Sequence, residues 1–304
     1  MEKIITIKNL TKKYGELAAV NNISFEVFKG EIFGLLGENG AGKTTTLEMI
    51  EGLRQPTSGE IEVLGHDIKK DRDLVKEKIG VQLQSSAYYQ FLTLTEILNL
   101  FGSFYNKKVD AMHLLEMVGL TSKAKSFVSK LSGGQKQRFS IVASLVNNPE
   151  VVFLDEPTTG LDPLARRHLW DLITQIKREG KTIILTTHYM EEAEILCDRV
   201  AIMEQGKILA MDDTHRLMNR AEYPYTVNFV KEDVKKSSIE KIQKFGKIEN
   251  LFGKNNHFIV RLKDKESSDK ALKIIEALEP ETLTLGRASL EDLFIELTGK
   301  SIEE

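Results

Sequence analysis

The clearest chemistry in the sequence lies in the glycine-rich stretch Gly37–Thr44, which reads GENGAGKT. An apolar run precedes it and a helical pattern follows it, which is the context that a phosphate-binding loop requires. Glycines let the backbone wrap closely around phosphates, so that N–H groups at the helix start face the negative charge. The loop therefore predicts a nucleotide site with the cofactor-binding residues Gly37, Glu38, Asn39, Gly40, Ala41, Gly42, Lys43, Thr44 and Thr45.

Three side chains at the end of this loop would act on the bound phosphates. Lys43 would add positive charge near the β- and γ-phosphates, and the Thr44 hydroxyl is placed to ligate Mg²⁺. Thr45 would donate a hydrogen bond to the α-phosphate. A glycine-rich turn without a ligand is the alternative interpretation, and the strand and helix that flank the loop argue against it.

Two carboxylates end another apolar strand, in the stretch VVFLDEP that begins at Val151. Ligand sites of α/β proteins form where strands leave the sheet, and strand alternation separates two consecutive side chains. We predict that Asp155 holds the metal, directly or through water, and that Glu156 activates the attacking water as a general base. A charged strand end that merely begins a turn at Pro157 is the competing interpretation, and the phosphate loop favours catalysis.

A histidine follows the apolar run TIILTT at the end of a third strand. A lone histidine usually has a structural role or lies on the surface, but His188 lies at a strand end beside the predicted site. We therefore predict that His188 donates to the γ-phosphate and senses its presence.

Two further side chains keep two interpretations each. Gln84 ends the strand IGVQLQ, and its amide could reach Mg²⁺ or the attacking water, or it could be a plain polar strand end. Tyr14, in LTKKYGE, could stack on adenine or be a surface aromatic at a turn.

A second glycine-bearing helix start lies in LSGGQKQR, which begins at Leu131. Apolar residues recur at helical spacing after it, which predicts a helix from Gln135 to about Asn147. The chain thus offers two backbone-donor sites for phosphate but one lysine-bearing loop, so it binds either two ligands or one ligand shared between two chains. In a head-to-tail dimer, the second site of one subunit would close over the γ-phosphate held by the other, through Ser132, Gly133, Gly134 and Gln135.

Composition narrows the class of protein. The 304 residues suffice for two domains, and a net charge of −3 gives no basic field for nucleic acid. The single cysteine, Cys197, excludes an internal disulfide and a zinc site of four cysteines. The N-terminus lacks the apolar run of a signal peptide, and no stretch approaches the ~18 apolar residues of a membrane span. We therefore expect a cytoplasmic protein whose membrane role, if any, depends on a partner.

The elements that position these residues follow from periodicity. Short apolar strands alternate with helical patterns over residues 1–220, which predicts an α/β domain with a mostly parallel sheet and antiparallel strands at its start. Residues 86–148 carry almost no strand signal and are expected to be a helical insert. The order β-α-β-β-α-β over residues 222–304 predicts a small α+β ferredoxin-like domain that ends in a helix from Ser289.

Taken together, these motifs resemble the nucleotide-binding subunit of ABC transporters. The resemblance covers residues 3–220 in the family's order and rests on LSGGQ, GENGAGKT, VVFLDEP, Gln84, His188 and the stretch TTGLD at Thr158–Asp162. It implies a P-loop NTPase cassette: a RecA-like core, an N-terminal antiparallel β subdomain and a helical insert. It also implies hydrolysis of ATP with Mg²⁺ as the metal, supports Tyr14 as the adenine platform, and suggests that Asp162 communicates across a dimer. Thr159 stands where serine is common.

The resemblance also implies partners. Two copies would bind two ATP at a shared interface, and the homodimer would lie at the inner face of the cell membrane, associated with it only through an integral-membrane permease. The insert near Ser85–Leu98 would receive a helix of that permease. The C-terminal residues ASLEDLFIELTG resemble the extension of cassettes in bacterial exporters of the drug-resistance, sodium-extrusion and cell-envelope branch. This extension would pack on itself, contact a second copy or regulate the cassette.

Two other classes remain as alternatives at this point. A soluble ABC-type ATPase could act on DNA or ribosomes, but DNA-repair members carry a long coiled coil before LSGGQ and translation-related members carry two cassettes. An importer cassette usually appends a small β-barrel, whereas this tail has three helical patterns. Export through a permease is the function that we expect.

Overall fold

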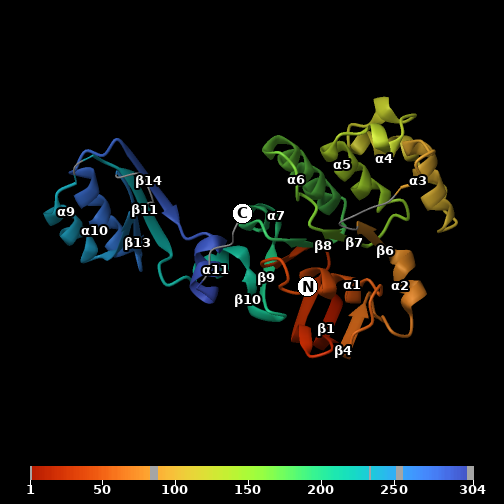
Figure 1. Cartoon of the computed structure of the whole chain (residues 1–304), viewed down its shortest axis with the longest axis horizontal. Helices are drawn as coiled ribbons and strands as arrows, with labels where there is room; N and C mark the ends of the chain where they lie inside the picture. The colour runs from red at the N-terminus through yellow and green to blue at the C-terminus, as the bar shows by residue number, and fades with distance from the viewer. Residues whose placement is uncertain (1, 83–87, 233, 251–255, 300–304) are drawn as a thin grey trace. The chain divides into compact units, whose positions relative to one another are not determined.

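The apolar strands assemble into three sheets in the computed structural model, which describes residues 2–82, 88–232, 234–250 and 256–299. Contacts divide the chain into two units, Met1–Asp212 and Asp213–Glu304 (Figure 1). No helix in the described part of the chain is long and apolar enough to span a bilayer.

An antiparallel sheet opens the first unit. β1 (Lys3–Tyr14) pairs with β2 (Leu17–Phe28) on one side and β4 (Ser58–Val63) on the other, and β5 (His66–Asp67) completes the order β2-β1-β4-β5. The ring of Phe25 stacks on that of Phe33 with centroids 5.2 Å apart, which joins this sheet to the core of the next one. The antiparallel strands expected at the start of the chain are therefore present.

A six-stranded sheet forms the centre of the first unit. Its order is β10-β9-β3-β8-β7-β6, and the five strands from β9 to β6 run parallel. Every residue of three central strands is buried, as continuous apolar runs predict for strands covered on both faces. The strands are β3 (Ile32–Leu36), β6 (Ile79–Gln82), β7 (Val151–Asp155), β8 (Thr182–Thr187), β9 (Arg199–Glu204) and β10 (Lys207–Asp213).

Parallel pairing places the chemistry-bearing residues at one edge. In the register of β3, β7 and β8, Leu36 lies opposite Thr187 and Asp155 lies opposite Thr186. The carboxyl ends of these three neighbouring strands thus meet, and the segments that follow them leave the sheet at the same place. The helices of this unit outside the insert are α1 (Lys43–Ile50), α2 (Arg72–Lys78), α6 (Pro163–Arg178) and α7 (Met190–Leu196).

The helical insert has the predicted character. Residues 88–148 contain α3 (Leu94–Ser103), α4 (Ala111–Met117) and α5 (Gly133–Ala143), which pack against one another (Figure 1), and two short 3₁₀ turns, η1 (Thr121–Lys123) and η2 (Val128–Lys130). Their only strand-like feature among the described residues is an isolated bridge between Thr93 and Phe127.

The limits of α5 differ from the predicted helix at Gln135–Asn147. The helix begins earlier because Ser132 and Gln135 form a reciprocal capping box, in which each side chain accepts the other's backbone N–H. It ends earlier because the chain turns at Ser144, whose hydroxyl donates to the Ile141 carbonyl. The sequence pattern predicted a longer helix because Leu145 and Val146, which follow this turn, are also apolar and buried.

The second unit has its own core. Its sheet has the antiparallel order β12-β13-β11-β14, with Phe229 stacked on Phe258 at 5.0 Å and α9 and α10 contributing Ile242 and Ile275 to the same cluster. α8 groups with this unit because it packs against α11. The elements are α8 (Thr214–Met218), β11 (Tyr225–Val230), α9 (Lys236–Gln243), β12 (Gly246–Asn250), β13 (His257–Leu262), α10 (Lys265–Glu276), β14 (Thr282–Arg287) and α11 (Leu290–Thr298).

The central sheet generates the first prediction. Phe153 of β7 is fully buried in the core, so Phe153→Ala should lower the free energy of unfolding by about 3–5 kcal/mol through lost burial and a cavity. The measurement is equilibrium unfolding in urea. The control Phe91→Ala removes a side chain that is 89% exposed and should change the value by less than ~0.5 kcal/mol. Equal effects of the two changes would contradict the assignment of Phe153 to the core.

Candidate functional site

The glycine-rich loop connects β3 to α1 at the carboxyl edge of the sheet. Gly42 caps α1 with a φ of 101°, and a Cβ there would lie 2.4 Å from the Ala19 carbonyl oxygen. Only glycine fits this position, because the left-handed backbone and the close strand both exclude a side chain. The loop thus turns directly into the N-terminus of a helix, where free N–H groups favour an anion.

The Lys43 ammonium is buried across its own loop. Its Nζ donates to the carbonyl oxygens of Gly37 at 2.8 Å and Glu38 at 3.0 Å, and the residue is 4% exposed. Burial lowers the pKa of Lys43, and the carboxylate of Glu156, 3.5 Å from Nζ, opposes that shift. The structure therefore holds a desolvated cation where the sequence predicts phosphate.

Asp155 and Thr44 come together from β7 and α1. The Thr44 hydroxyl donates to Asp155 Oδ1 at 3.1 Å, and the Thr186 hydroxyl donates to the same oxygen at 2.5 Å. Burial raises the pKa of Asp155, while these two hydrogen bonds lower it. A carboxylate beside a hydroxyl is an oxygen donor set of the kind that Mg²⁺ prefers, so the residues fit this ion.

Other metal arrangements find no support in the described part of the chain, which has no group of three or more His, Cys, Asp or Glu side chains able to hold an ion. Mg²⁺ needs no such cage, because it is commonly bound through one or two protein oxygens, phosphate oxygens and water. The donor set thus suits an ion that arrives with a nucleotide. Gln84, the third predicted metal residue, lies outside the described residues.

Glu156 occupies a strained backbone position between two basic groups. Its φ is 46°, in the left-handed region that non-glycine residues seldom adopt, and such strain is found mostly at functional sites. Its Oε1 lies 3.5 Å from Lys43 Nζ and 3.4 Å from His188 Nδ1, while its Oε2 accepts from the Thr159 hydroxyl at 3.1 Å. The carboxylate is therefore held at both oxygens.

His188 lies where the sequence predicts it, beside Glu156 at the end of β8. Its ring packs against that of Tyr189, with ring centroids 4.2 Å apart. The guanidinium group of Arg166, a residue of α6, lies 4.2 Å from the centre of the Tyr189 ring. The structure thus brings together five of the predicted residues, which are Lys43, Thr44, Asp155, Glu156 and His188.

The residues of LSGGQ form a different site. Ser132, Gly133, Gly134 and Gln135 line a pocket of about 460 Å³ together with Asp162, and among the described residues its lining includes none of the five named above. Asp162 caps α6 by accepting from the N–H groups of Leu164 and Ala165 at 3.0 Å. The pocket therefore lies at the N-termini of two helices, α5 and α6, where the N–H groups of Gln135, Leu164 and Ala165 already have side-chain acceptors.

Tyr14 lies at the end of β1 and is 43% exposed. Lys12 Nζ lies 5.2 Å and the Arg54 guanidinium carbon 5.6 Å from the centre of its ring, as in cation–π contacts. An aromatic face at the surface is available at this position.

The sequence patterns did not predict a role in the site for two hydroxyl groups. Thr186 joins the two carboxylate residues, because its hydroxyl donates to Asp155 and accepts from the Glu156 N–H at 2.9 Å. Thr159, which stands where serine is common, donates from its hydroxyl to Glu156 Oε2. The available signal was that two threonines end an apolar strand immediately before His188.

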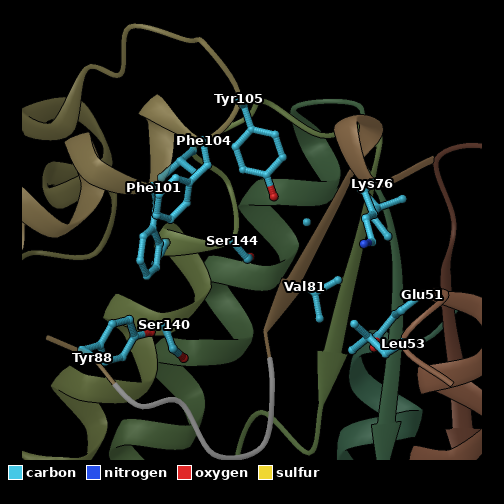
Figure 2. Close-up of a pocket in the computed structure, with 14 residues that line it drawn as sticks. Glu51, Leu53, Lys76, Val81, Tyr88, Phe101, Phe104, Tyr105, Ser140 and Ser144 are labelled. Atoms are coloured by element: carbon cyan, nitrogen blue, oxygen red, sulfur yellow. The ribbon is translucent and has the colours of Figure 1, made fainter. Parts of the chain in front are cut away.

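Another pocket, of about 440 Å³, lies beside the helical insert (Figure 2). One wall carries Glu51, Leu53 and Lys76, from the end of α1 and from α2. The facing wall carries aromatic rings of the insert. Tyr88 stacks on Phe101 at 6.1 Å, and Phe101 stacks on Phe104 at 6.1 Å.

The sequence and fold match characterised proteins. The family described as ABC transporter matches residues 20–159. A linearmycin resistance ATP-binding protein of Bacillus subtilis (strain 168) is 36% identical over 99% of this chain and 100% of its own length. A Nod factor export ATP-binding protein I of Burkholderia lata is 37% identical over 99% of this chain and 98% of its own length.

Solved structures agree with this result. An ATP-binding subunit of an ABC transporter superposes with a TM-score of 0.65 at 30% identity, covering 71% of this chain and 92% of its own. The ATP-binding cassette MJ0796, solved as a dimer in a post-hydrolysis state with ADP and Pi, gives a TM-score of 0.63 at 28% identity, covering 69% of this chain and 98% of its own.

The Thr186 bridge generates the second prediction. Thr186→Val keeps the shape but leaves the Asp155 oxygen and the Glu156 N–H without this partner, so the free energy of unfolding should fall by about 1–3 kcal/mol. ATP turnover should fall by about tenfold or more, because Glu156 loses one of its supports. Urea unfolding and steady-state ATPase assays measure both, and Thr186→Ser should restore them. A valine variant with native stability and turnover would contradict the bridge.

Proposed function

Because this chain belongs to the ATP-binding, ATP-hydrolysing subunits of ABC transporters, we propose that it powers export through a separate membrane-spanning permease by ATP-driven closure of two copies. Two relatives named for linearmycin resistance and Nod factor export support export, and their similarity extends over 99% of the chain. These relatives argue for export over the importer and soluble-ATPase alternatives.

The observation that carries the proposal is the division of the predicted site into two clusters. Lys43, Asp155 and Glu156 form one cluster, and the LSGGQ residues form another pocket with Asp162. One nucleotide held between two chains uses both clusters, with the first from one subunit and the second from its partner. A homodimer through two composite ATP sites follows, and the dimeric state of the MJ0796 cassette supports this arrangement.

The residues of each chain would then have distinct roles. Gly37, Glu38, Asn39, Gly40, Ala41, Gly42 and Thr45 surround the phosphates by backbone and hydroxyl donors, and Tyr14 stacks on adenine. Thr44, Asp155 and Gln84 would hold Mg²⁺, which when bound offsets phosphate charge. Ser132, Gly133, Gly134 and Gln135 of the partner close over the γ-phosphate, and Asp162 lies at that interface.

Lys43 prepares the site for the phosphates. Within the chain its ammonium is compensated by two loop carbonyls and by Glu156. Phosphate oxygens would replace these partners by charged acceptors in a buried place, where such pairs are stronger than in water. The same exchange would free Glu156 Oε1 from the lysine.

Glu156 would accept the proton of the water that attacks the γ-phosphorus. Thr159 holds Oε2 and thereby leaves Oε1 to face the reaction. His188, 3.4 Å from Oε1, would donate to the γ-phosphate and orient the carboxylate. One preorganised donor of this kind contributes ~3 kcal/mol at a transition state.

The two parts of the chain would have different roles. Residues 1–220 act as the cassette, and residues 222–304 form an accessory domain for which we propose a ferredoxin-like topology. The sheet order β12-β13-β11-β14 with α9 and α10 against its core supports that topology. The pocket beside the insert would receive a helix of the permease, which would keep the protein at the cytoplasmic face of the cell membrane.

The composite site generates the third prediction. Glu156→Gln should bind ATP·Mg²⁺ but lower turnover by at least 10²-fold, because the general base is lost. Since hydrolysis would no longer open the interface, the variant should become a dimer with ATP. Size-exclusion chromatography with light scattering measures the mass, and a monomer at saturating ATP would overturn the shared site.

Lys43→Ala serves as the control for this experiment. It removes the buried cation, so nucleotide affinity should fall by at least tenfold by calorimetry, and Glu156→Gln/Lys43→Ala should stay monomeric. A dimer in the double variant would show association without nucleotide and would contradict ATP as the link between the chains.

The transport role generates the fourth prediction. Tagged Glu156→Gln expressed in its source cells should co-purify from detergent-solubilised membranes with one polytopic membrane protein, and without nucleic acid. Reconstitution of that protein with the wild-type chain should raise ATPase activity above that of the chain alone. Recovery of ribosomes or DNA in place of a membrane protein would favour the soluble class.

A further inference from the structure

A buried carboxyl group lies in the pocket beside the insert. Glu51 is 2% exposed, and within the described part of the chain no hydrogen-bond donor reaches its Oε1. Its backbone N–H closes the last turn of α1 by donating to the Leu47 carbonyl at 2.9 Å, so the residue is fixed in position. A buried carboxyl group usually has a hydrogen-bond partner, because its desolvation is otherwise uncompensated.

The surrounding charges make the position unfavourable for an anion. Burial, with Asp155 and Glu48 as neighbouring acids, raises the pKa of Glu51 to about 8. The neighbouring basic groups do not compensate it among the described residues. Arg54 is paired with Glu48 at 2.6 Å, and Lys76 lies on the same pocket wall without an ion pair to Glu51.

The rest of the pocket is complementary to an apolar segment. Figure 2 shows Glu51 and Leu53 facing the rings of Phe101, Phe104 and Tyr88 across the cavity. At the rim, Leu53 is 49% and Phe104 is 64% exposed, which adds exposed apolar surface to the aromatic wall of the pocket. The hydroxyls of the α5 serines on the wall already donate to carbonyls of their own helix. Glu51 is thus the buried group of this pocket that offers charge.

The electrostatics of α1 favour a cation at the same place. Glu51 caps the C-terminus of α1, where the helix carries its partial negative charge. A positive group there would interact with the carboxylate, with the helix end and with the nearby acids. An apolar helix with one basic residue therefore matches the pocket better than a wholly apolar one.

We propose that the pocket binds a segment of the permease that places aromatic or aliphatic side chains against Phe101 and Tyr88 and pairs one lysine or arginine with Glu51. The inference rests on the proposed function, because it names the chemistry of the partner that docks beside the insert. The cation would turn a neutral buried acid into a paired carboxylate, which confines the interaction to partners that carry the charge at one place.

The test uses the complex of this chain with the membrane protein that co-purifies with it. Glu51→Gln keeps the shape and the hydrogen-bonding capacity but removes the charge, so the dissociation constant of the chain for the solubilised permease should rise at least tenfold. The matched control Glu77→Gln removes an exposed carboxylate of α2, beside Lys76 but outside the pocket lining, and should change the dissociation constant less than twofold. Native affinity of Glu51→Gln would overturn the proposal.

A double-mutant cycle identifies the cation. Each lysine and arginine in the permease's cytoplasmic segments is replaced by glutamine. One of these changes should weaken binding as Glu51→Gln does and add no further loss in combination with it. If every permease cation proves independent of position 51, the pocket takes another occupant and the proposal is wrong.

Two readouts separate the possible causes of failure. If the wild-type chain recovers no permease, the proposed function itself fails, and the inference with it. If it recovers the permease equally well with glutamine at position 51, only the inference fails. Urea unfolding of the isolated Glu51→Gln chain should show no loss of stability, because no described residue donates a hydrogen bond to Oε1. A loss would reveal an internal partner and would also overturn the proposal.

Discussion

The site depends on one buried ammonium group. Lys43 is 4% exposed, and burial of such a cation is costly unless oxygens surround it. Two loop carbonyls and Glu156 supply those oxygens within the chain, and this requirement explains why the loop closes on its own lysine. A triphosphate would offer more charge than carbonyls do, so the same requirement would favour a bound nucleotide.

The parallel sheet provides the rigid edge on which this exchange occurs. Asp155 and His188 leave neighbouring strands, and Thr186 between them ties Asp155 to the Glu156 backbone. These hydrogen bonds join the two carboxylate residues into one cluster, whereas LSGGQ lines a separate pocket together with the start of α6. Two halves at different places in the chain are what our proposal of a site shared between two subunits requires.

The sequence predicted those features that depend on local pattern. Glycine spacing and strand ends located the loop and the carboxylates, because each follows from nearby residues, whereas the predicted start of α5 was too late. Features that depend on tertiary contacts were not predicted from the sequence. Thr186 looked like one more residue of a buried strand, the strain at Glu156 has no sequence signal, and the apolar pattern hid the turn at Ser144. Burial of the Glu51 oxygen likewise has no local sequence signal, because Glu51 lines a pocket together with residues of the insert, which are distant in sequence.

The short helix α1 joins the two places where ligands of opposite charge are proposed to bind. Lys43 is its first residue and Glu51 caps its last turn, while Leu47, Met49 and Ile50 between them are buried in the core. A helix packed in this way transmits displacement rather than absorbing it, because close-packed interiors resist compression. The helix dipole stabilises an anion at the N-terminus of α1 and a cation at its C-terminus. On our proposal, nucleotide binding and permease docking therefore act on a single rigid element, and a change at one end is felt at the other.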